Sequence, residues 1–144
     1  MSTGPGDLLE LREDEHLAEL VKSWNFLPGK IFQKNILYNY RSSVHHPSSS
    51  PSGAFHMLAV FRRYTFRLSE SSASLALHAC LGGTPAGFHV TYQSKRHFRF
   101  SVANKRVGLA VRDLRRVTTD QFDVYFHLWR DGGANSQQEA RRWD

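Results

Sequence analysis

Residues 97–116, HFRFSVANKRVGLAVRDLRR, join a strand pattern to a helix pattern and decide the predicted fold. The first six residues alternate polar and apolar side chains, and with Ala103 they predict a strand over 97–103. Asn104 is a natural N-cap for a helix over 104–116, in which apolar residues recur three and four positions apart. The strand has one apolar face, formed by Phe98, Phe100 and Val102, and one polar face, formed by His97, Arg99 and Ser101.

Similar patterns on both sides of this stretch extend the prediction to the order β-α-β-β-α-β. Strands are expected over 58–68, 88–93 and 122–129, and a helix over 70–81 that begins after Ser69 and ends at Gly82-Gly83. This order is typical of the ferredoxin-like and RRM-like folds. The predicted fold class is therefore α+β, with a four-stranded antiparallel sheet, two helices on one face and an N-terminal helical arm.

Composition divides the chain into four segments. We expect an acidic N-terminal helix and apolar arm over 1–41, a Ser/Pro-rich linker over 42–55, the RRM-like domain over 56–133 and a helical tail over 134–144. Within the arm, the helix should run from 7 to 24 and break at Pro28-Gly29. Residues 30–41 fit a strand or a short helix equally well.

The net charge of +6 conceals a strong asymmetry along the chain. Residues 1–20 hold six carboxylates and one arginine, a net charge of −5, which leaves +11 for the rest. Fourteen of the 19 basic residues are arginine, whose planar guanidinium group binds phosphates and stacks on bases. The basic body is consistent with nucleic acid as a partner, but also with a generic solvated surface or with a site for the acidic arm.

Several classes of protein are excluded by what the 144 residues lack. A single cysteine, Cys80, permits neither an internal disulfide framework nor a cysteine-based zinc site, and we expect it to be a buried, inert thiol. No apolar run reaches the roughly 18 residues of a membrane span, and the acidic start is unlike a targeting signal. We expect a nuclear or cytoplasmic protein that is not an enzyme, with no cofactor, metal or membrane contact.

The sheet face opposite the helices is the main candidate site, because RRM-like modules stack single-stranded RNA or DNA bases there. The residues expected on this face are Arg63, Arg67, His97, Arg99, Tyr125 and Trp129. Basic residues of the turn and the second helix should contact phosphates: Lys95, Arg96, Lys105, Arg106, Arg112, Arg115 and Arg116.

Protein binding is the alternative function. The N-terminal arm could cover the sheet face, which would end the stacking hypothesis. The protein would then bind a protein partner or a second copy of itself. The residues expected to make such contacts are Leu17, Leu20, Val21, Trp24 and Trp143.

Three strings resemble one known family: RYTFRLSESSASLALHACLGG, HFRFSVANKRVGLAVRDL and FDVYFHLWRDGGA. The family is a plant domain of unknown function, many of its members from grasses, that precedes CCHC zinc knuckles in retrotransposon-derived and related proteins. The resemblance implies the RRM-like fold and nucleic-acid binding. These 144 residues hold no CCHC motif, so a repurposed copy that acts through protein contacts is the alternative.

Overall fold

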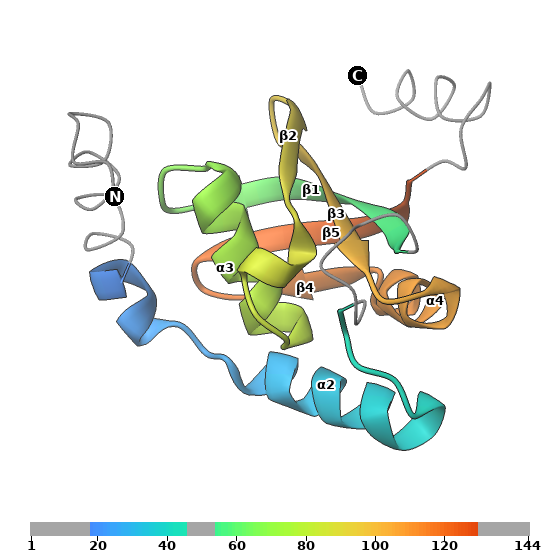
Figure 1. Ribbon diagram of the computed structural model, residues 1–144. Helices are drawn as coiled ribbons and strands as arrows, with labels where there is room; N and C mark the ends of the chain where they lie inside the picture. Colours follow the sequence, from blue (N-terminus) through green and yellow to red (C-terminus); the bar gives the residue numbers. More distant parts are fainter. Residues whose placement is uncertain (1–17, 46–53, 130–144) are drawn as a thin grey trace, which may run out of the picture.

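The computed structural model describes residues 18–45 and 54–129, which form an α+β fold (Figure 1). Its sheet has five antiparallel strands in the order β2-β3-β1-β5-β4. The strands are β1 (Phe55–Tyr64), β2 (Thr91–Ser94), β3 (His97–Val102), β4 (Arg116–Thr118) and β5 (Phe122–Leu128). The helical elements are η1 (Val21–Ser23), α2 (Leu27–Tyr40), α3 (Glu70–Leu81), η2 (Ala86–Phe88) and α4 (Lys105–Leu114).

The two predicted domain helices are confirmed, and polar side chains cap both. At the start of α3, the Ser69 hydroxyl accepts the Ser72 N–H, while the Ser72 hydroxyl accepts the Ser69 N–H. The side chain of Asn104 caps α4 in the same way, accepting the Val107 N–H at 3.0 Å. These local signals are visible in the sequence, because a cap acts over only three residues.

The first strand starts and ends earlier than predicted. β1 covers Phe55–Tyr64 rather than 58–68, and its core-facing residues are Met57, Ala59 and Phe61, which are fully buried. The alternation of arginine and aromatic residues after 62 imitates a strand, but Phe66 and Arg67 lie in the turn before α3. The stronger apolar run further upstream decides the position, because it buries more surface against the helices.

The prediction of four strands is wrong, because a short fifth strand lies at the edge of the sheet. The helix α4 ends at Leu114, and Arg115 adopts a positive φ of 62° that redirects the chain. Residues Arg116–Thr118 then pair with β5 instead of extending the helix to 116. A three-residue strand has no detectable periodicity in a sequence, which is why this element escaped prediction.

The hydrophobic core lies between one face of the sheet and the helices. Aromatic rings from three strands fill it, among them Phe61, Phe98, Phe100 and Phe126, all buried. The helix α4 approaches β1 closely at Gly108, where a Cβ atom would overlap the ring of Phe55. The residues that alternate with these apolar residues along the strands lie on the other face of the sheet.

The N-terminal arm differs from the prediction in both structure and place. Residues 18–20 are helical and continue into η1, as predicted, whereas 7–17 lie outside the described residues. Pro28-Gly29 does not break a helix but opens one, α2, because the first turn needs no N–H from proline. Figure 1 shows α2 beside the end of α3, so this segment packs on the helix layer and leaves the opposite sheet face uncovered.

Two further segments tie the arm to the domain. Trp24 is buried, with its ring 5.0 Å from Phe66 and 5.4 Å from Phe122. The start of the predicted linker is also packed: the Val44 carbonyl accepts the Ala103 N–H, and the ring of His45 lies against Phe88. The remainder of that linker, 46–53, lies outside the described residues, as does the predicted tail helix.

Candidate nucleic-acid interface

The sheet face opposite the helices has an apolar floor surrounded by cationic and aromatic side chains. Leu58 of β1 pairs with Arg99 of β3 on one side and His127 of β5 on the other. Val60, two residues along, lies between His97 and Tyr125. Leu58 and Val60 are less than 10% exposed.

Tyr125 is the centre of the cationic part of this face. The guanidinium carbons of Arg62 and Arg116 lie 5.5 Å and 5.2 Å from the centre of its ring. Both distances are within the range of favourable cation–π contact. Arg62 follows Leu58 and Val60 on this face by the alternation of β1, and a β-bulge between Phe61 and Arg63 leaves it without a partner on β5. The sequence prediction took the alternation from Arg63, beyond this bulge, and therefore did not include Arg62.

A second cation–π pair lies further along the same face. The guanidinium carbon of Arg99 is 5.4 Å from the centre of the Trp129 ring. The backbone N–H of Trp129 donates to the His56 carbonyl at 3.2 Å. Burial, assisted by the positive charge of Arg99, lowers the pKa of His56 below its ordinary value. The face therefore carries fixed positive charge from arginine, with His56 held toward its neutral form.

The negative charge of one carboxylate on this face is compensated by an ion pair. Asp123 accepts two hydrogen bonds of 2.8 Å from Arg116 and one of 3.0 Å from Thr118. The Arg116 hydrogen bond is the main cause that lowers the pKa of Asp123, and the charge of Arg63 adds to it. The ion pair leaves Arg116 half exposed and fixes its guanidinium group beside Tyr125.

The predicted base-contacting residues do not all reach the middle of the face. His97, Arg99, Tyr125 and Trp129 lie on it, as described above. Arg63 lies at the end of β1, where its guanidinium group donates to the carbonyls of Thr119 and Asp120 in the β4–β5 turn. Arg67 follows β1 in the turn to α3, so it is not a central residue of the sheet.

The predicted phosphate-contacting residues divide between two sides of the molecule. Lys95 and Arg96 are exposed in the turn that joins β2 to β3, at the edge of the sheet. Lys105, Arg106 and Arg112 are exposed on α4, which lies on the core side. Arg115 follows that helix, whereas Arg116 lies on the sheet face opposite the helices. One bound strand on the sheet would therefore not contact the α4 residues.

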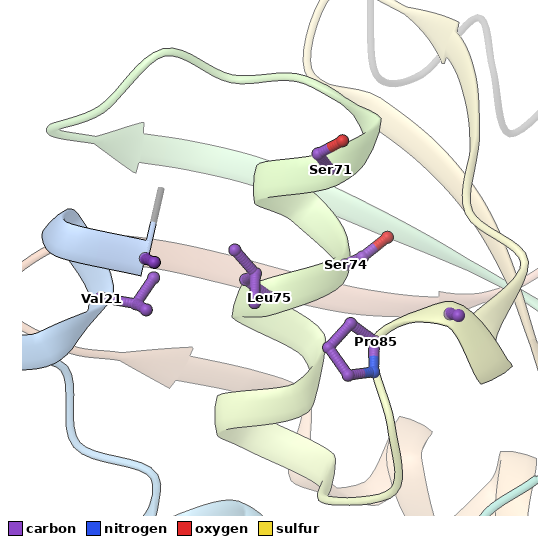
Figure 2. A pocket seen from close by; sticks show the side chains of 7 residues that line it. Val21, Ser71, Ser74, Leu75 and Pro85 are labelled. Atoms are coloured by element: carbon purple, nitrogen blue, oxygen red, sulfur yellow. The ribbon is translucent and has the colours of Figure 1, made fainter. Parts of the chain in front are cut away.

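The residues predicted for protein contacts do not form one surface either. Trp24 belongs to the core, and Leu20 and Val21 pack partly against it. Val21 and Leu75 line an apolar groove of about 460 Å³ between η1 and α3, with Pro85 and two serines at its border (Figure 2). The Ser74 hydroxyl donates to the Glu70 carbonyl within the helix. Leu17 and Trp143 lie outside the described residues.

Three further properties concern catalysis and membranes. Cys80 is buried, as predicted, and burial raises the pKa of its thiol, so a reactive thiolate is disfavoured. Within 18–45 and 54–129, no three His, Cys, Asp or Glu side chains are grouped so that they could hold a metal ion. None of the helices described is long and apolar enough to cross a membrane.

Comparison of the chain with protein-family models, curated proteins and solved structures found no match.

Proposed function

We propose that this protein is a binding module whose open sheet face holds single-stranded RNA or DNA. The observation that carries the proposal is the grouping of Tyr125 and Trp129 with Arg62, Arg99 and Arg116 on one face that the described residues leave uncovered. Aromatic and guanidinium planes stack on bases, and the arginine charge attracts the phosphate backbone.

The rest of the face supports the same ligand. Leu58 and Val60 offer an apolar floor on which a base or sugar can rest once the side chains above them move. Asp123 would not repel phosphates strongly, because Arg116 compensates its charge. Single strands are favoured over duplexes, because stacking requires bases that are not already paired.

We infer a ferredoxin-like relationship for the fold. The strand order β2-β3-β1-β5 supports it, because β1 and β3 then lie inside the sheet, as in RRM-like modules, with β4 as an addition at the edge. Descent from the plant domain that precedes zinc knuckles remains part of this proposal and rests on the sequence strings alone.

Fluorescence anisotropy with labelled single strands of RNA and DNA tests the proposed binding. We expect binding at low salt and a decline in log K with log salt of about 0.7 per phosphate neutralised. A duplex of the same sequence should bind more weakly. Failure to bind any single strand at low salt would overturn the proposal.

A pair of charge-matched variants locates the site. Replacing Arg62 and Arg99 with alanine should weaken binding strongly and reduce the salt dependence. Replacing Lys105 and Arg106 removes the same charge from the other side of the molecule and should have a much smaller effect. Tyr125→Leu keeps the charge and should cost about 1–3 kcal/mol if a base stacks there. Equal losses in the two double variants would rule out a site on the sheet.

A further inference from the structure

The helix α2 is apolar on two opposite sides, and the residues that the structure describes cover only one of them. Gly29, Phe32 and Ile36 recur at helical spacing and face α3 and the core. Leu27, Ile31 and Tyr38 occupy the opposite side of the helix and are 51–81% exposed. A surface helix usually has one polar face, so a second apolar stripe indicates a contact surface.

The outer side of α2 is also uniformly basic. Lys30, Lys34 and Arg41 are exposed along it, and residues 27–41 contain no carboxylate. Among the described residues, neither lysine forms an ion pair. At the end of the helix, Leu37, Tyr38 and Arg41 line a hollow of about 430 Å³, large enough for an aliphatic side chain. The surface therefore fits a partner that combines leucines with carboxylates.

We propose that α2 binds the acidic N-terminal segment 7–17 of a second copy of this chain. That segment, DLLELREDEHL, holds five carboxylates and one arginine, together with four leucines. Its composition complements α2 in both charge and apolar character. Its eleven residues also match the stripe from Leu27 to Tyr38, which is about 16 Å long at 1.5 Å per residue.

The position of Ala18 favours a second copy over the same chain. Ala18 borders the groove beside Ser71 and Leu75 of α3, whereas the outer side of α2 points away from α3. A segment that leaves from Ala18 therefore starts beside α3 and not beside the outer side of α2. Two copies can exchange their segments, and twofold symmetry then forms the contact twice.

Disulfide trapping between full-length chains tests which surfaces meet. A Leu11→Cys chain is mixed with a Tyr38→Cys chain in a glutathione redox buffer, and the buried Cys80 keeps the background low. We expect a mixed disulfide dimer to form in preference to either homodimer. An Arg112→Cys chain, altered at an exposed site on α4, replaces the Tyr38→Cys chain as control and should give none above background.

Each alternative arrangement of the two chains would give a different disulfide product. Tyr38→Cys homodimers in excess would show that α2 packs on α2, and an intramolecular disulfide in the doubly substituted chain would place the segment on its own copy. Either result, or no disulfide above the control, overturns the proposal.

Charge reversal provides a test that misfolding cannot imitate. Lys30→Glu with Lys34→Glu should weaken self-association about tenfold or more in analytical ultracentrifugation, because attraction becomes repulsion. Adding Glu10→Lys and Glu13→Lys to the same chain should restore it. A strictly monomeric wild-type chain, or no rescue by the compensating changes, would contradict the proposed contact.

Discussion

At the scale of single residues, His45 shows how one side chain holds a loop. Its ring lies between Gly83 and Gly87, where a Cβ atom at either position would overlap it. Its Nε2 accepts the Thr84 N–H at 2.8 Å. Burial lowers the pKa of His45 below 6.5; the contact with the Thr84 carbonyl opposes this shift, and the nearby charges of His89 and His78 add to it. The neutral ring is therefore the form that fits.

This burial predicts a dependence of stability on pH. Because the folded pKa lies below the unfolded value, the unfolding free energy is highest above pH 6.5 and decreases as the pH falls below it. His45→Gln should be less stable at pH 7.5 but should lose less stability between pH 7.5 and 5.5. Urea unfolding of the wild-type chain and of His45→Gln at several pH values measures this. An unchanged pH dependence in His45→Gln would contradict the assignment.

At the scale of elements, the crossing of α2 and α3 depends on a glycine. A Cβ atom at Gly29 would overlap the carbonyl oxygen of His78 and lie 2.7 Å from the Gly82 nitrogen. Gly82 itself has a φ of 78°, which few other residues adopt without strain. The sequence Pro28-Gly29 therefore permits both the start of α2 and its close contact with the end of α3.

Gly29→Ala tests the crossing directly. The added methyl group meets backbone atoms that cannot move aside, so we expect a loss of about 1–3 kcal/mol in unfolding free energy. Asn35→Ala, on an exposed part of the same helix, should change stability by less than about 0.5 kcal/mol. Chemical denaturation of both variants measures the difference. A stable Gly29→Ala protein would mean that the two helices separate at little cost.

At the scale of the whole molecule, the arm and the domain share one core. Trp24 comes from the arm but packs against Phe66 and Phe122 of the domain. We therefore expect one cooperative unfolding transition. In a chain with Trp129→Phe and Trp143→Phe, the fluorescence of Trp24 should follow the same urea curve as the far-ultraviolet circular dichroism. A fluorescence change at lower urea would show that the arm detaches first.

The local signals in the sequence predicted much of the fold. Ser69 and Gly82-Gly83 define the two ends of α3, and Asn104 defines the start of α4, because caps and helix stops act over a few residues. The alternation in 97–102 and 122–128 predicted β3 and β5 and the direction of Arg99 and Tyr125. For the candidate site, the sequence therefore identified the main residues of two strands.

The tertiary structure decided what depends on contacts between distant segments. The bulge that shifts the alternation of β1 after Phe61 arises from the pairing of β1 with β5, and β4 exists because it pairs with that same strand. The sequence also did not predict on which side of the sheet the arm packs. Because α2 is apolar on two sides, either side of the helix could have met the domain. The sequence by itself determined the elements with strong local patterns. Only long-range packing, which local patterns do not record, decided that α2 lies on α3 and that the cationic face of the sheet is left uncovered by the part of the chain described.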